Sequence, residues 1–93
     1  MTHPAKTLPA PAADIDRHWI GSLARVDRLT SRQLEVFLLL GRGMSNRQIA
    51  VALEVSEHTV KAHIAKVLRT LGLESRLQAG LAALLHQQRD SPG

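Results

Sequence analysis

The sequence predicts an all-α domain with an aliphatic core. The chain has 93 residues, which is enough for one small domain. It contains one Trp, one Phe, no Tyr and no Cys, so neither disulfides nor a thiolate zinc cluster can support the fold. Four helix-start signals with the same local chemistry follow one another from Leu29 onward. Together these observations favour four helices packed on helices.

Each predicted helix begins after a side chain that can cap its first backbone amides. The capping residues are Thr30, Ser45, Ser56 and Ser75. A glutamine three residues later completes a capping box at three of them, through Gln33, Gln48 and Gln78. Glycines then supply the left-handed conformation that ends helices, at Gly41, Gly43 and Gly72. The predicted helices cover residues 30–41, 46–53, 57–71 and 76–88.

The remaining segments are divided by composition. Residues 1–13 hold three of the four prolines and are predicted to form a disordered or extended tail. Residues 14–27 place apolar side chains at helical spacing, so we interpret them as an extra N-terminal helix or a linker. Residues 28–88 form the predicted domain, and residues 89–93 are expected to fray.

The predicted core collects the apolar stripes of the four helices. Its members are Leu34, Phe37, Leu38, Ile49, Ala50, Leu53, Val55, Val60, Ile64, Val67, Leu68, Leu71 and Leu73. This core is small and has no covalent support, so we expect modest stability.

Positive charge is concentrated in the middle of the chain. The formal net charge is +4, and the sequence pI is about 10.7. Eight basic and four acidic residues lie between Arg28 and Arg76, whereas four of each lie in the flanks. The whole excess therefore falls on the predicted domain, which favours a polyanionic partner.

The helix predicted over residues 57–71 presents two different faces. One stripe is apolar and must face the core, and it follows the 3.6-residue period. The opposite face carries His58, Ala62, Ala65, Lys66 and Arg69, with Lys61 on one edge and Thr59 and His63 on the other. Two small alanines bring a helix axis close to base edges, and their methyl groups can pack on thymine. The basic side chains can reach guanine edges or phosphates.

A basic helix face is also typical of an ordinary solvated surface helix. Three features favour a DNA-reading helix instead: the tight turn at residues 54–56, the two alanines and the local charge excess. An enzyme is not expected, because the five histidines show no metal-ligand spacing. Neither a phosphate-binding glycine loop nor a nucleophile motif is present, and no cofactor or metal is expected.

Residues 29–85 resemble the C-terminal DNA-binding domain of LuxR-type transcription regulators, also called the GerE or NarL/FixJ type. The matching positions include Leu29-Thr30, Arg32, Glu35-Val36, Gly43, Ser45-Asn46, Ile49-Ala50, Leu53, Ser56, Thr59-Val60-Lys61, His63, Leu71-Gly72, Ser75-Arg76 and Ala79. The resemblance implies a four-helix helix-turn-helix domain. Its third helix would enter the major groove of double-stranded DNA.

The resemblance also assigns individual contacts. By position, Lys61, Ala62 and Ala65 would face the groove. Candidate phosphate or groove-edge contacts would be Thr59, Arg47, Lys66, Arg69 and Arg76. Glu35 would tie the first helix to the rest of the domain through an internal hydrogen bond or ion pair.

The chain departs from the family pattern at several positions. Gln33 stands where many relatives have Glu, and Ala65 where some have a polar or basic side chain that reads a base. Lys66 and Thr70 replace a frequent Asn and a frequent Lys. Readout would therefore depend more on methyl contacts and DNA shape.

The fourth predicted helix carries a stripe of leucines. The stripe packs on the core in one interpretation, and in the other it joins two copies of the chain as the family's fourth helix commonly does. The candidate dimer residues are Leu77, Gly80, Leu81, Leu84 and Leu85. A dimer would present two recognition helices to half-sites about one helical turn apart.

The expected function is sequence-specific DNA binding by a bacterial transcription regulator. Residues 1–27 are too short for a sensor domain, so we expect either a free-standing regulator or the DNA-binding fragment of a response regulator. A cytoplasmic, nucleoid-associated homodimer is expected, with RNA polymerase as a further partner. The alternative is a module like sigma region 4, or one that titrates another regulator. Lys61, Lys66 and Arg69 discriminate between them, because only direct DNA binding requires these side chains.

Overall fold

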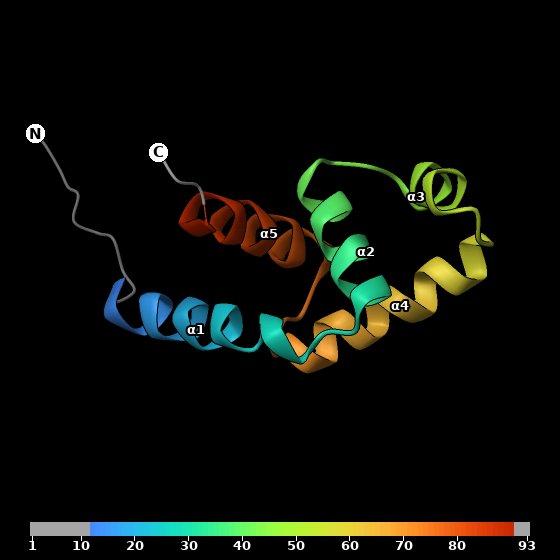
Figure 1. The fold of residues 1–93 in the computed structure, drawn as a ribbon. Coiled ribbons are helices and arrows are strands. Elements are labelled where there is room, and N and C mark those ends of the chain that lie inside the picture. The colour runs from blue at the N-terminus through green and yellow to red at the C-terminus, as the bar shows by residue number, and fades with distance from the viewer. Residues whose placement is uncertain (1–11, 91–93) are drawn as a thin grey trace, which may run out of the picture.

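The computed structural model describes residues 12–90 of the chain. Helices joined by short turns make up this part (Figure 1). In chain order the elements are α1 (Ala12–Ala24), the 3-10 helix η2 (Val26–Arg28), α2 (Ser31–Gly41), α3 (Asn46–Leu53), α4 (Glu57–Leu71) and α5 (Arg76–Asp90). No strand occurs among these residues, so the predicted all-α class is confirmed. The tail was predicted over residues 1–13 and the frayed end over 89–93. Residues 1–11 and 91–93 lie outside the described residues, whereas residues 12–13 belong to α1 and residues 89–90 to α5.

The helix boundaries lie close to the predicted ones. The extra N-terminal helix is present as α1, which begins two residues before the predicted start, and η2 follows it. At the other end, α5 runs to Asp90, two residues beyond the prediction. The starts of α2, α3, α4 and α5 could be predicted because a short-range capping contact marks each of them.

The capping contacts explain where three of these helices begin. Thr30 and Ser45 each form a complete capping box, at the starts of α2 and α3. The expected box at Ser75 differs. Its Oγ accepts from the amide of Gln78 at 3.2 Å, but the Gln78 side chain accepts from the amide of Glu74 at 2.7 Å rather than from that of Ser75. The glutamine therefore caps one residue further toward the N-terminus.

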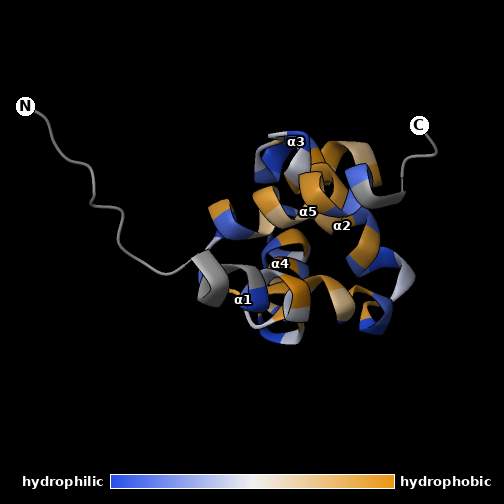
Figure 2. Cartoon of the chain, turned by 90° about the vertical axis from the view of Figure 1, so that its left-hand side faces the viewer, coloured by the Kyte–Doolittle hydropathy of each residue, from blue (hydrophilic) through white to orange (hydrophobic). Residues whose placement is uncertain are grey.

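The hydrophobic core lies where α2, α4 and α5 meet, and α3 and η2 close its ends. Eight of the predicted core residues are buried: Phe37, Ile49, Ala50, Val60, Ile64, Val67, Leu71 and Leu73. The other five pack against the core but stay partly exposed, namely Leu34, Leu38, Leu53, Val55 and Leu68. Six buried hydrophobic residues were not predicted: Val26, Val36, Leu40, Ala79, Ala82 and Ala83. Figure 2 shows hydrophobic segments of α2 and α5 beside one another near the centre of the molecule.

Two glycines allow α2 and α5 to approach closely. A Cβ added to Gly41 would stand 2.7 Å from the Cβ of Ala83, and one added to Gly80 would stand 3.1 Å from the carbonyl oxygen of Leu40. Gly80, which we named as a candidate dimer residue, thus makes a close approach within one chain, between α5 and α2. Because larger residues would force these helices apart, the small residues here set the position of α5.

None of the described helices is both long and apolar enough to cross a membrane.

Candidate nucleic-acid interface

Helices α3 and α4 are joined by a three-residue turn with one left-handed residue. Glu54 ends α3 at φ 60° and ψ 45°, and the amide of Val55 donates to the carbonyl of Ala50 at 3.0 Å. A residue in this conformation reverses the chain direction quickly, so α4 starts at once. The pair α3 and α4 therefore forms the predicted helix-turn-helix.

The first turn of α4 is held by hydroxyl groups. Ser56 Oγ accepts from the amide of Thr59 at 3.0 Å and donates to Thr59 Oγ1 at 3.0 Å. Thr59 is half-buried, so part of its side chain takes part in the cap. Its own hydroxyl proton is not used in these two contacts and can be donated to a phosphate oxygen.

The opposite faces of α4 match the helical-wheel prediction. Its buried residues are Val60, Ile64, Val67 and Leu71. Its exposed residues are Glu57, His58, Lys61, Ala62, Ala65, Lys66 and Arg69. Every predicted groove residue on α4 thus lies on the outer side, except that Thr59 and His63 are half-buried at its edge. The two alanines leave the middle of this face low, which permits close approach of a polyanion.

The cations of this face have no acidic partners. Among the residues that the structure describes, no carboxylate forms an ion pair with Lys61, Lys66 or Arg69. The acidic residue of α4 is Glu57 in the first turn, where a negative charge is favourable at the positive end of the helix dipole. Glu57 was not among the predicted site residues, although its place beside the cap could have indicated its exposure. The face as a whole is positive, as a phosphate-binding surface requires.

The two arginines carried over from outside α4 have different environments. Arg47 lies exposed in the first turn of α3. Arg76 is exposed too, but its guanidinium donates to Asn46 Oδ1, and its Nη2 donates to the Met44 carbonyl at 2.6 Å. Arg76 therefore ties the start of α5 to the start of α3, a role that sequence reasoning missed. A guanidinium has five N–H groups, so others remain for a phosphate.

Glu35 does not hold α2 to the rest of the domain. Its carboxylate is exposed and pairs with Arg32 at 3.4 Å, three residues earlier in the same helix. The prediction that Glu35 links α2 to another element is therefore wrong. A pair between residues i and i+3 joins neighbouring turns of the same helix and no second element. No group of three potential metal ligands occurs among the described residues.

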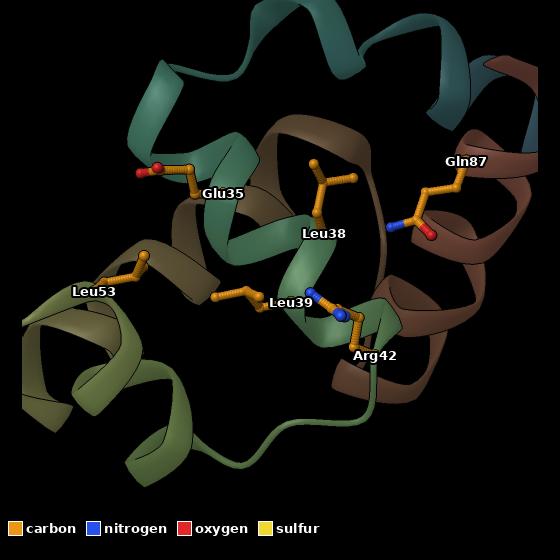
Figure 3. A pocket seen from close by; sticks show the side chains of 6 residues that line it. All are labelled: Glu35, Leu38, Leu39, Arg42, Leu53 and Gln87. Carbon is orange, nitrogen blue, oxygen red and sulfur yellow. The ribbon is translucent and has the colours of Figure 1, made fainter. Parts of the chain in front are cut away.

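An open pocket lies between α2, α3 and α5 (Figure 3). It is lined by Glu35, Leu38, Leu39, Arg42, Leu53 and Gln87. None of these side chains belongs to α4, and the set includes no nucleophile. This pocket therefore has no part in the basic face.

The leucines of α5 form a second surface. Leu77, Leu81, Leu84 and Leu85 are 71%, 44%, 45% and 39% exposed. Three of them line a groove that also includes Gly41, Met44 and Gly80. One prediction was that this leucine stripe packs on the core. It is wrong for these four residues, because alanines of α5 are buried in the core instead. Neighbouring exposed leucines are typical of a protein contact.

An all-α core with a tight α3–turn–α4 unit and a basic outer face defines a helix-turn-helix DNA-binding domain. The family model "Bacterial regulatory proteins, luxR family" (GerE) matches residues 27–83. The chain belongs to this family of DNA-binding transcription regulators.

Similar curated proteins include bacterial response regulators. The chain is 49% identical over 61 residues to the nitrate/nitrite response regulator protein NarP of Escherichia coli (strain K12). This alignment covers 66% of the chain and 27% of NarP. It is 33% identical over 81 residues to the protein NarL of the same strain, covering 87% of the chain and 37% of NarL. It is 38% identical over 60 residues to the response regulator protein VraR of Staphylococcus aureus (strain Mu3 / ATCC 700698), covering 64% of the chain and 29% of VraR. The chain thus spans well under half the length of these relatives.

Proposed function

We propose that this protein regulates transcription by binding specific double-stranded DNA as a homodimer, with α4 in the major groove. The observation that carries the proposal is the outer face of α4. There Lys61, Lys66 and Arg69 surround two exposed alanines and have no acidic partner within the part of the chain that the structure describes. Unpaired exposed cations gain most when they replace the counterions of DNA. A surface that served only to titrate another protein would not need them.

Arg47 extends the proposed contact beyond α4, and Arg76 supports it. Arg47, His58 and Thr59 lie in the first turns of α3 and α4, and the first backbone amides of a helix are also donors for a phosphate. Arg76 would act mainly by holding α3 in place through Asn46. Base discrimination would come from Lys61 and from methyl contacts of Ala62 and Ala65 with thymine.

The proposed dimer uses the leucine surface of α5. In a two-fold dimer the same patch of each copy meets its equivalent, and Leu77, Leu81, Leu84 and Leu85 form one such patch. Two α4 helices would then reach half-sites roughly one helical turn apart. The DNA-binding domain could be a free-standing regulator or a fragment of a response regulator. The mass of the native gene product distinguishes these two alternatives. A regulator of this kind would work at the nucleoid, in contact with RNA polymerase.

The proposal is tested by selecting duplexes from a random pool with the purified protein and sequencing them. Fluorescence anisotropy then measures affinity for a selected duplex over a series of salt concentrations. We expect Lys66→Ala with Arg69→Ala to weaken binding and to lower the salt slope by about 2, since each lost phosphate contact removes roughly one unit.

The matched control is Arg28→Ala with Arg42→Ala. It removes the same two charges from exposed positions in η2 and at the end of α2. We expect this control to keep most of the wild-type slope. The groove assignment is wrong if the α4 double variant retains the wild-type affinity and slope, and DNA binding itself is wrong if no duplex is enriched.

A further inference from the structure

Two segments that lie far apart in the sequence meet at the C-terminal end of α4. Arg25 follows α1 directly, and its Nη2 donates to the carbonyl oxygen of Leu71 at 3.0 Å across 46 residues. Leu71 is the last residue of α4 and is fully buried. Figure 1 shows that the end of α4 lies next to the segment that joins α1 to α2. The recognition helix is thus capped from the N-terminal part of the chain.

A cation is favourable at the C-terminal end of α4. The amide of Leu73 donates to the carbonyl of Leu68 at 2.9 Å, and that of Gly72 donates to Arg69 at 3.4 Å. These two hydrogen bonds satisfy the carbonyls of Leu68 and Arg69. Neither of them satisfies the carbonyl of Leu71. A guanidinium supplies the missing donor, and its charge is favourable at the negative end of the helix dipole.

Gly72 leaves space for this guanidinium, and Gly21 lies within contact distance of its other side. Gly72 has φ +70°, and a Cβ there would stand 2.8 Å from Arg25 Nη2. On the other side, a Cβ at Gly21 of α1 would stand 3.6 Å from Nη1. The guanidinium therefore lies between α1 and the end of α4, and its contacts depend on α1 being docked.

The same helix end carries two of the proposed DNA contacts. Lys66 and Arg69 lie in the last two turns of α4, and both are exposed. Their direction toward a phosphate depends on these turns staying helical. Arg25 and α1 precede residue 27, where the family match begins. This tie therefore joins a residue before the family match to the last residue of α4, which lies within it.

We propose that Arg25 is a positioning residue, which couples the docking of α1 to the order of the last turn of α4 and thereby to DNA binding. The inference rests on the proposed function. Anything that releases α1 would loosen Lys66 and Arg69, and bound DNA would in turn favour docked α1, because such coupling is reciprocal. Arg25 reaches DNA only through α4.

Trp19 gives a direct readout of docking that needs no DNA. It is the single Trp of the chain, and it is half-buried in α1 against the core. We expect Arg25→Ala to make Trp19 emission more sensitive to acrylamide quenching, whereas Arg28→Ala should leave the quenching unchanged. Arg28 is the matched control, since it is an exposed arginine three residues further on. Circular dichroism verifies that both variants are folded at the working temperature.

The DNA measurement uses the full chain and the selected duplex. We expect Arg25→Ala to weaken binding by about threefold to tenfold at constant salt slope, a size usual for residues that modulate coupling. Arg25→Lys, which keeps the charge and one donor, should recover part of the loss. Adding duplex to Arg25→Ala should return Trp19 quenching toward the wild-type value.

Several results would overturn the inference. One is wild-type affinity in Arg25→Ala, and another is a salt slope lowered by about 1, which would make Arg25 a phosphate contact. Unchanged Trp19 quenching in Arg25→Ala rejects the docking role. If Arg25→Ala fails to fold, Arg25→Gln keeps a neutral donor and gives the same readouts. If the wild type binds no duplex, the proposed function fails, and quenching alone still decides whether Arg25 holds α1.

Discussion

Ser22 is the fully buried polar residue of α1, and its Oγ has no hydrogen-bond partner among the described residues. A buried hydroxyl without a partner has lost its hydration and gained nothing in return. We expect Ser22→Ala to raise the free energy of unfolding by about 1 kcal/mol. Chemical denaturation measures the change. Ser31→Ala at an exposed position is the control and should change stability little, and a destabilised Ser22→Ala would show that the hydroxyl finds a partner.

Glu54 is the non-glycine residue with positive φ among those described, at φ 60°. The left-handed conformation costs an L-residue roughly 1–2 kcal/mol, and glycine avoids this cost. We therefore expect Glu54→Gly to stabilise the domain by about 0.5–1 kcal/mol. Thermal unfolding gives the readout.

The control for this turn is Glu57→Gly, which makes the same substitution inside α4. There the conformation is right-handed, so glycine should destabilise by about 1 kcal/mol. Equal effects at both positions would contradict the conformational explanation.

Some residue contacts could not be predicted because they join distant parts of the chain. Arg25 and Leu71 are 46 residues apart, and Arg76 and Asn46 are 30 apart. No periodicity or capping rule relates such positions. The interpretation of Glu35 was wrong for the converse reason, since its partner Arg32 lies on the same helix surface.

At the scale of the element, the helices were predictable from local rules. A hydroxyl at Thr30, Ser45 or Ser56 fixes where a helix starts, and Gly72 fixes where α4 ends. The outer face of α4 could also be predicted, because a 3.6-residue period leaves only one arrangement of its apolar stripe. The caps do not reveal which residues of α5 are buried in the core and which stay exposed.

The leucine surface of α5 provides a test of the proposed dimer. Leu77 is 71% exposed in one chain, and a lysine there would place a charge in the proposed contact. We expect Leu77→Lys to raise the dimer dissociation constant by about tenfold or more, as central apolar contacts usually do. Sedimentation equilibrium measures this constant.

Val51→Lys is the matched control for the dimer. Val51 is 72% exposed but lies on α3, outside the leucine surface. The control should dimerise like the wild type. Unchanged association in Leu77→Lys would show that α5 does not form the contact.

For the whole molecule, the decisive packing contact joins α2 and α5. A methyl group at Gly41 would stand 2.7 Å from the Cβ of Ala83, which no ordinary packing allows. We expect Gly41→Ala to lower the free energy of unfolding by about 1–2 kcal/mol, because the strain exceeds the gain in helix propensity. Thermal unfolding followed by circular dichroism measures the change.

Gly21→Ala is the control for that contact. The nearest atom to a Cβ there is Arg25 Nη1 at 3.6 Å, an ordinary distance. Helix propensity should therefore prevail, and the control should be neutral or stabilised by up to about 1 kcal/mol. A stabilised Gly41→Ala would contradict the close packing.

The burial of α5 was the part of the global arrangement least accessible to the sequence. Its core residues are Ala79, Ala82 and Ala83, whereas the larger leucines stay outside. Hydrophobic patterning favours the larger side chains for the interior. The opposite result accompanies the close approach of α2 and α5 at Gly41 and Gly80, where a Cβ added to Gly41 would meet that of Ala83 at 2.7 Å.

The low centre of the α4 face affects how the protein would search a chromosome. Ala62 and Ala65 offer no hydrogen bond to a base, while the surrounding cations attract any phosphate backbone. Non-specific sites, which number roughly 10⁶ or more in a genome, would therefore compete strongly for each molecule. Occupancy of a true operator would then depend on copy number and on sliding along DNA as much as on intrinsic affinity.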